Sequence, residues 1–235
     1  MSTSPNSTST RPGLHEVLAR VHLFRELEPE WLERLAAGAR LFKAERGEVL
    51  FEAGDPATGF YYLIQGRVKL VLLSPSGAEK VVEIVREGMT FGEAVVFIEQ
   101  PFPVTAQATE PSHVLYMGRS ALLECVGHDP AFAFKMLAGL SRRLHSIVRD
   151  VESYSLCSAT QRVIGYLLRE AEAPTVDGRC TIELPATKAV VASRLNLTPE
   201  TLSRALHELS DLGLISVHGR TIEIVDLNRL CGDAQ

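Results

Sequence analysis

The 235-residue sequence has no apolar run that approaches the eighteen or more residues of a membrane-spanning helix. Its four cysteines, Cys125, Cys157, Cys180 and Cys231, contain no C-x-x-C pair, which predicts free thiols in a reducing compartment. An H-x-H motif or a close His and Glu set that could hold a catalytic metal, as in a cupin-like enzyme, is also absent. We therefore expect a cytoplasmic protein that does not enter a membrane and is not an enzyme.

Basic residues are not in excess, because 24 Lys and Arg stand against 29 Asp and Glu and the formal net charge is −5. Binding to DNA would therefore depend on local basic residues and direct base contacts rather than on the overall field. The hydrophobic content of 46% supports a sizeable core, and the length suits two modest domains better than one. The polar N-terminal residues lack the apolar stretch of a signal peptide and predict a disordered tail.

The segment Lys188 to Gly219 has the pattern of a helix, a tight turn, a second helix and a hairpin. Asn196 tolerates the left-handed conformation of a sharp turn, and Thr198 with Pro199 caps the start of the second helix. After Gly213, a plausible end for that helix, two alternating runs predict the strands of a wing. This order predicts a winged helix-turn-helix.

Polar residues occupy the first two turns of this second helix. Glu200, Ser203 and Arg204 stand at i, i+3 and i+4 and project together, where a recognition helix enters the major groove. Arg can donate two hydrogen bonds to one guanine, and Glu can accept a hydrogen bond from the cytosine amino group. Ser can either donate to a base edge or accept from one. The alternative is an ordinary solvated face with a Glu–Arg pair, but the surrounding motif favours DNA recognition. The candidate DNA-binding residues are Glu200, Ser203, Arg204, Lys188, Thr198, Arg194 and Arg220.

Short alternating runs separated by turn residues extend from Leu41 to Met117. Many short strands at even spacing predict an antiparallel barrel or jelly roll. Helical spacing at 14–21 and 29–39 predicts short helices ahead of this roll. The clearest strand candidates are 48–51, 59–64, 67–72, 80–85 and 114–117.

From Asp129 the pattern becomes helical for about seven turns, with apolar residues at steps of four and three, which is the spacing of a two-stranded coiled coil. The alternative is packing against the chain's own roll, which we expect for Phe132, Phe134 and Met136. Two protomers would read a palindrome with helices about one DNA turn apart. Residues 155–159 are the expected hinge. The seam is Ala133, Leu137, Leu140, Leu144, Ile147, Val151 and Tyr154, and dimerisation is assigned to Leu137, Leu140, Leu144, Ile147 and Val151.

The segment Thr198 to Arg204 resembles the recognition helix of the cyclic-AMP receptor protein and fumarate-nitrate reduction regulator superfamily, in its E-x-x-S-R version. The resemblance implies that Glu200, Ser203 and Arg204 read a half-site of the TTGAT type, and it extends over about 21–225. It is greatest for the dissimilatory nitrate respiration regulators of the denitrification branch. That likeness rests on Phe60 to Ile64, Phe91 to Ala94 and Thr105 to Ala108.

The resemblance implies an α+β chain and a homodimeric transcription regulator that binds double-stranded DNA and contacts RNA polymerase. We expect a disordered or helical tail at 1–18 and an antiparallel β-roll (jelly roll) sensory domain at 19–127. A dimerisation helix with its hinge would follow at 128–156, and a winged helix-turn-helix at 157–235.

Cyclic AMP is not the expected effector. In cyclic-nucleotide-binding members of the family, a Gly-Glu segment meets the ribose and phosphate, and an Arg about ten residues later pairs the phosphate charge. Gly92 and Glu93 match the first part, but no Lys or Arg lies between Glu93 and Gly118. A cyclic-nucleotide-responsive regulator remains the alternative. We expect an apolar effector pocket lined by Phe60, Tyr62, Gly92, Glu93, Val95, Val104, Met136 and Leu140.

The denitrification branch is associated with haem and nitric oxide, so the resemblance implies haem held without a covalent bond in this pocket. His22 lies in a His-Leu-Phe segment comparable to one in that branch and is the candidate axial ligand, although a lone histidine is more often an ordinary surface residue. The oxygen-sensing branch holds an iron-sulfur centre on cysteines near its N-terminus. No cysteine precedes Cys125, so we expect no iron-sulfur cluster.

Overall fold

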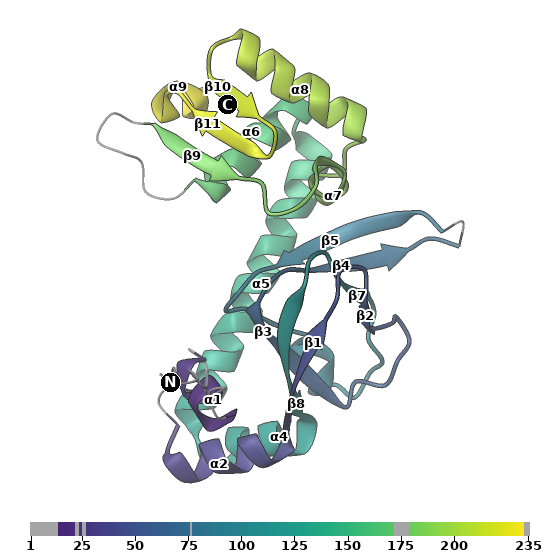
Figure 1. The fold of residues 1–235 in the computed structure, drawn as a ribbon, viewed down its shortest axis with the longest axis vertical. Helices are drawn as coiled ribbons and strands as arrows, with labels where there is room; N and C mark the ends of the chain where they lie inside the picture. Colours follow the sequence, from purple (N-terminus) through teal and green to yellow (C-terminus); the bar gives the residue numbers. More distant parts are fainter. Residues whose placement is uncertain (1–13, 22–23, 25–26, 76, 172–178, 233–235) are drawn as a thin grey trace, which may run out of the picture.

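The computed structural model describes residues 14–21, 24, 27–75, 77–171 and 179–232. Two lobes lie at the two ends of one long helix, α5 (Pro130–Leu156), with the roll at its start and a smaller domain beyond its end (Figure 1). In the part of the chain that is described, no helix is both long and apolar enough to cross a membrane.

The first lobe is a roll of two four-stranded antiparallel sheets, with strand orders β1-β8-β3-β6 and β2-β7-β4-β5. Stacked aromatic rings fill its interior, including Phe51 and Phe102 with ring centroids 3.8 Å apart. The predicted antiparallel roll is therefore confirmed. The strands are β1 (Ala39–Ala44), β2 (Val49–Phe51), β3 (Gly59–Gln65), β4 (Val68–Leu73), β5 (Glu79–Val85), β6 (Thr90–Phe91), β7 (Thr105–Ala108) and β8 (Ser112–Gly118).

A second core joins the roll to the helices around it. Phe24 stacks on Phe132 of α5 with centroids 5.8 Å apart, and both are buried together with Met136. Phe134 was expected here too, but 71% of it is exposed, because it lies two residues from each buried neighbour and so on the opposite side of the helix. The helices of this lobe are α1 (Leu14–Arg20), α2 (Pro29–Gly38), α3 (Glu93–Val96) and α4 (Arg119–His128).

An apolar stripe on α5 is left uncovered by the chain itself. Leu137, Leu144 and Val151 recur every seven residues, and each is more than half exposed, as is Ile147. A contiguous exposed apolar face of this kind marks an interaction surface. The end of the expected seam differs, because Tyr154 turns toward the second lobe and bonds there to the backbone oxygen of Arg194.

The second lobe is built on α6 (Ala159–Glu170), which starts with a reciprocal capping box between Ser158 and Gln161. Because this cap begins α6 so soon, only Cys157 and Ser158 separate it from α5, and the connection is shorter than the expected 155–159. A strand that the sequence did not reveal, β9, extends the wing to a sheet of order β10-β11-β9. The elements are α7 (Lys188–Arg194), α8 (Pro199–Asp211), β9 (Cys180–Glu183), β10 (Ile215–His218), β11 (Thr221–Ile224) and α9 (Leu227–Gly232).

The turn between α7 and α8 has the predicted chemistry. Asn196 adopts a left-handed φ of 57°, and the hydroxyl of Thr198 accepts a hydrogen bond from the Thr201 amide at 3.2 Å. Pro199 occupies the first turn of α8, and Gly213, with φ of 67°, follows its end. The helix-turn-helix and its wing are confirmed.

Candidate nucleic-acid interface and effector cavity

The two faces of α8 are sharply different. Glu200, Ser203 and Arg204 are exposed, whereas the apolar face packs into the core of the lobe. Burial of that face fixes which side of α8 is turned outward, so the polar residues project together from its first two turns. The buried residues are Leu202, Ala205, Leu206 and Leu209.

The hydrogen bonds around Glu200 favour the ionised form of its side chain. Hydrogen bonds from its own backbone amide and from the Thr198 hydroxyl hold the pKa of Glu200 below its ordinary value. The side chain is therefore a carboxylate at neutral pH and can only accept, which suits the amino group of cytosine. Arg204 donates to the Thr201 hydroxyl at 3.4 Å and otherwise faces outward.

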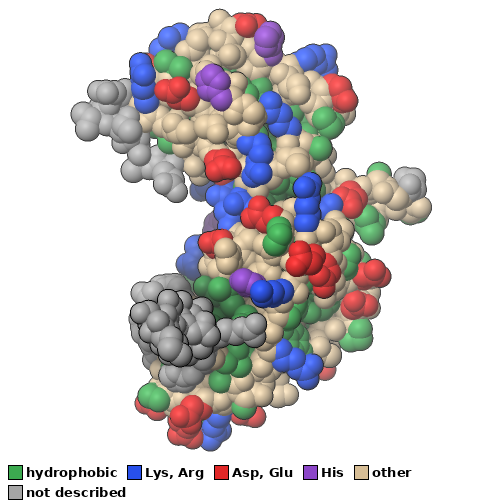
Figure 2. All heavy atoms as spheres, viewed as in Figure 1, with side chains coloured by type: hydrophobic (Ala, Val, Ile, Leu, Met, Phe, Trp, Pro, Cys, Tyr) green, Lys and Arg blue, Asp and Glu red, His purple; other side chains and the backbone are tan. Residues whose placement is uncertain are grey.

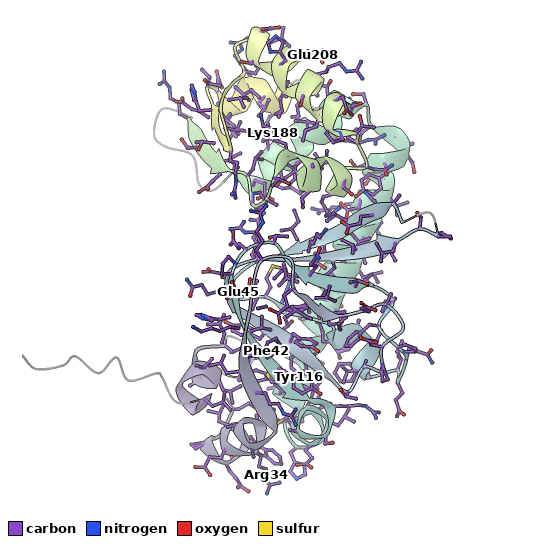
Figure 3. The ribbon with its side chains drawn as sticks, turned by 45° about the vertical axis from the view of Figure 1, so that its right-hand side comes forward. Arg34, Phe42, Glu45, Tyr116, Lys188 and Glu208 are labelled. Atoms are coloured by element: carbon purple, nitrogen blue, oxygen red, sulfur yellow. The ribbon has the colours of Figure 1, made fainter. Side chains whose placement is uncertain are left out.

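Two further basic candidates lie on the same lobe. Lys188 is the first residue of α7 and is half-buried; Figure 3 labels it together with Glu208 of α8. Arg220 precedes β11, is exposed, and donates to the backbone oxygen of Leu184 at 2.8 Å and 3.3 Å. Both cations belong to the helix-turn-helix and its wing, where phosphates would flank a bound major groove.

Arg194 is placed differently from the other candidates. Its Nη2 donates to Asp150 Oδ2 of α5 at 2.6 Å and its Nη1 to the Tyr154 hydroxyl at 2.8 Å. Its side chain is only 17% exposed. In this arrangement the guanidinium faces α5, so contact with a DNA phosphate would require the ion pair with Asp150 to open.

The residues around Arg194 join α7 to the roll. Lys80 of β5 donates to the Ser193 backbone oxygen, and the Val81 amide donates to the Ser193 hydroxyl at 2.9 Å. Burial lowers the pKa of Lys80 to about 8, with the nearby charge of Arg194 acting in the same direction. Figure 1 shows α7 directly beside β5. We refer to this contact as the α7 dock, and it consists of Lys80, Val81, Asp150, Tyr154, Ser193 and Arg194.

A cavity of about 490 Å³ lies between the roll and α5. Four of the predicted pocket residues line it, namely Tyr62, Glu93, Met136 and Leu140. Asp150 and Arg194 of the α7 dock line it as well. A molecule in this cavity would therefore touch the ion pair that holds α7 of the helix-turn-helix against α5.

The remaining pocket residues lie elsewhere. Phe60 is fully buried in the core between roll and helices, and Val95 and Val104 belong to the aromatic interior of the roll. These three were placed wrongly because alternation along a strand does not tell which interior a side chain enters. Gly92 precedes α3 with φ of 80°, close against the ring of Phe102, and is not among the lining residues.

The cavity is not apolar, which corrects the sequence-based expectation. Arg143 of α5 forms ion pairs with Glu93, at 2.8 Å, and with Glu83 of β5. Glu93 is 6% exposed, and its Oε2 has no hydrogen-bond partner among the described residues. The sequence has no cation shortly after Glu93, but the structure places Arg143 of α5 beside this residue. The guanidinium of Arg143 is already paired with the carboxylates of Glu83 and Glu93.

Donors for haem iron in this cavity are limited. None of the described residues that line it is a histidine or a cysteine, while Met136 offers a thioether and Tyr62 a phenol. Burial raises the pKa of Tyr62, which disfavours its ionised form and leaves Met136 as the better donor. His22 lies outside the described residues. Within the ranges that the structure covers, no group of three or more His, Cys, Asp or Glu is placed to hold a metal ion.

Sequence reasoning missed the residues that connect the two lobes. Lys80, Arg143 and Asp150 are polar residues on a strand and a helix, and their partners lie from 44 to 113 residues away in the chain. Arg162 was also missed; it donates to the backbone oxygens of Tyr154 and Asn196 across the hinge at 3.0 Å and 3.2 Å. A sequence motif does not reveal such pairs.

Comparison with known proteins gives consistent matches over both lobes. Residues 41–129 match the family model described as a cyclic nucleotide-binding domain, and residues 161–232 match that of a Crp-like helix-turn-helix domain. The CRP-like cAMP-activated global transcriptional regulator of Mycobacterium tuberculosis is 27% identical over 226 residues, which covers 94% of this chain and 100% of that protein.

Two other relatives extend this result. The global nitrogen regulator of Synechococcus elongatus is 30% identical over 185 residues, covering 77% of this chain and 83% of that protein. The crystal structure of the sensor domain of the transcriptional regulator DNR from Pseudomonas aeruginosa is 38% identical, with a TM-score of 0.51, and covers 57% of this chain and 91% of that domain.

Proposed function

This chain belongs to the CRP/FNR family of transcription regulators, and we propose that it is a homodimer that reads a TTGAT-type palindrome under the control of an effector in the cavity beside α5. The observation that carries the proposal is the exposed group of Glu200, Ser203 and Arg204 on the capped first turns of α8. In such a regulator, contact with RNA polymerase would follow DNA binding.

Dimerisation is supported by the uncovered stripe on α5. Leu137, Leu144 and Val151 would form the seam with the same residues of a second copy, because seven-residue spacing keeps one face of each helix toward its partner. A two-fold symmetric pair would present two α8 helices to successive major-groove segments of a palindrome. Neither copy would then leave its apolar stripe in water.

Control of DNA binding would act through the α7 dock. The dock fixes α7, and with it the recognition helix α8, against the roll of the same protomer. Because Asp150 and Arg194 line the cavity, an effector there would contact the dock directly. An effector that favours the undocked arrangement would free Arg194 for a phosphate and let both recognition helices reorient.

Nitric oxide sensed through haem is the effector we propose first. The resemblance to the denitrification regulators and the 38% identity to the DNR sensor domain support it. Met136 would hold the iron through its thioether, and Leu140 would pack against the group. When bound, haem would supply an iron centre that takes up nitric oxide. Absorbance spectra of the protein titrated with haem, with and without nitric oxide, test this; Met136→Ala should shift the spectrum.

A cyclic nucleotide is the second candidate, and one observation favours it. The buried Oε2 of Glu93 has no hydrogen-bond partner in the described part of the chain and belongs to a residue that lines the cavity, so a ligand hydroxyl would satisfy it. Isothermal titration with cyclic AMP distinguishes the two candidates. Saturable binding that is lost in Glu93→Gln would favour the nucleotide, whereas a flat titration beside a clear haem spectrum would favour haem.

Binding of DNA tests the proposal as a whole. Arg204→Gln should weaken binding to a TTGAT-type palindrome by about 1–3 kcal/mol, because a forked contact to a base is lost. Arg229→Gln, on α9, changes the charge equally and serves as the control. Fluorescence anisotropy would measure both against a scrambled duplex. Equal affinity of the wild-type protein for the palindrome and the scrambled duplex, in every effector state, would refute the proposal.

A further inference from the structure

A second cavity lies on the other side of α5 from the apolar stripe and is surrounded by cations. Its volume is about 410 Å³. Figure 2 shows Lys and Arg side chains, together with some Asp and Glu, at the waist where the two lobes meet. The residues that line the cavity are Arg142, His145, Ser146, Arg149, Asp150 and Arg169.

The arginines of this cavity have no carboxylate to neutralise them. Among the residues that the structure describes, Arg142, Arg149 and Arg169 form no ion pair. Asp150 is the one acid in the lining, and its carboxylate is already bound to Arg194 at 2.6 Å. Three solvent-exposed arginines therefore line one space without a bound carboxylate among the described residues, an arrangement that an anion would stabilise.

The positions of these arginines leave the cavity open in a dimer. Arg142 and Arg149 are seven residues apart, so both lie on one face of α5, two turns from each other. Arg142 is two residues from Leu144 of the exposed stripe, a rotation of about 200° around the helix. The cations and the dimer seam are therefore on nearly opposite sides of α5.

We propose that this cavity binds a small anion that carries two or more phosphate groups. The planar guanidinium fork matches phosphate oxygens in a bidentate manner, and three such forks exceed what a single monovalent anion would satisfy. The Ser146 hydroxyl and the His145 ring add donors to the same lining. This site adjoins the cavity assigned to the effector, and Arg142, Ser146 and Asp150 line both.

Occupation of the site would connect two helices across the hinge. Arg142 and Arg149 belong to α5, whereas Arg169 belongs to α6, the first helix of the DNA-binding lobe. An anion held by both helices resists rotation about Cys157 and Ser158. The bound anion therefore stabilises the present arrangement of the lobes and raises the temperature at which the protein unfolds.

Isothermal titration with inorganic pyrophosphate tests the proposal on the full-length protein at 0.15 M salt. We expect saturable binding by the wild type and a loss of affinity of about tenfold or more in Arg142→Gln/Arg149→Gln and in Arg169→Gln. The matched control is Arg46→Gln, an exposed arginine on the turn between β1 and β2, which should bind as the wild type does. Pyrophosphate should raise the melting temperature above that in sodium chloride of equal ionic strength. This increase should be larger for the wild type and Arg46→Gln than for the cavity variants.

Three results would overturn the proposal: a flat titration with the wild type, equal binding by Arg46→Gln and the cavity variants, or a melting temperature that follows ionic strength alone. If the cavity variants lose affinity for duplex DNA while pyrophosphate does not bind, the arginines contact the DNA backbone instead. Wild-type binding to the palindrome is measured separately, so failure of the anion site and failure of the regulator proposal give different results.

Discussion

Replacing Asp150 with Asn should tighten DNA binding in the absence of an effector. The change removes the carboxylate that holds Arg194 at 2.6 Å, in a pair whose side chains are 14% and 17% exposed. Exposed ion pairs contribute about 0–1 kcal/mol, and removal of one partner from a fully buried pair costs about 3–5 kcal/mol. For this partly buried pair we expect a loss of about 1–2 kcal/mol from the docked arrangement.

The expected change in DNA affinity follows from that energy. Since about 1.4 kcal/mol corresponds to a factor of ten, the balance between docked and undocked forms should shift by about 5–30-fold. Where the docked form dominates, the apparent affinity for the palindrome should rise by a similar factor, and Arg194 becomes free to meet a phosphate. Fluorescence anisotropy with a labelled palindrome at 0.15 M salt measures the change.

The control for Asp150→Asn is Glu152→Gln, because Glu152 is exposed on the same helix, forms no ion pair among the described residues and carries the same charge. This variant separates the effect of the dock from the general effect of removing a negative charge from a DNA-binding protein. Affinity of Asp150→Asn that is no higher than that of Glu152→Gln would show that the dock does not restrain DNA binding.

Three further predictions follow from the same contacts. Leu144→Glu places a charge in the exposed stripe and should give monomers in analytical sedimentation. The control Leu123→Glu, at an exposed position on α4, should remain dimeric. If both variants remain dimeric, the stripe is not the dimer interface. Thr198→Ala removes the cap of α8 and should destabilise the protein by about 1 kcal/mol in urea unfolding. Burial lowers the pKa of Lys80 to about 8 from 10.5, so stability should rise with pH across that interval, where only the unfolded state holds the proton; Lys80→Met should remove this rise.

Much of the fold is predictable from the sequence, because its signals are local. Thr198 and Pro199 begin α8, Asn196 forms the turn before it with a left-handed φ, and the Asp129 carboxylate caps α5 by accepting a hydrogen bond from the Ala131 amide. Each signal acts within a few residues and therefore has the same meaning in most folds. The sequence did not predict strand β9, which pairs with the distant strand β11 rather than across a hairpin, or helix α4, whose apolar residues do not form a clear stripe.

Some features of the candidate site also follow from local sequence signals, whereas others depend on contacts between distant residues. The exposed trio on α8 follows from helical spacing, and half of the predicted pocket residues do line the cavity. The charged character of the cavity was missed, since Arg143 meets Glu83 and Glu93 only after α5 packs across the roll. The burial of Arg194 was missed for the same reason, since nothing near it in the chain indicates Asp150.

The sequence by itself determined the order of the elements, their caps, and the side chains that α8 presents to solvent, because periodicity and capping depend on neighbours within one or two helical turns. Only the tertiary structure decided which charges meet, Arg143 with its two carboxylates and Arg194 with Asp150, and which arginines gather in the second cavity. These pairings join residues far apart in the chain, and ion pairing depends on distance in space and on burial, neither of which is set by local spacing.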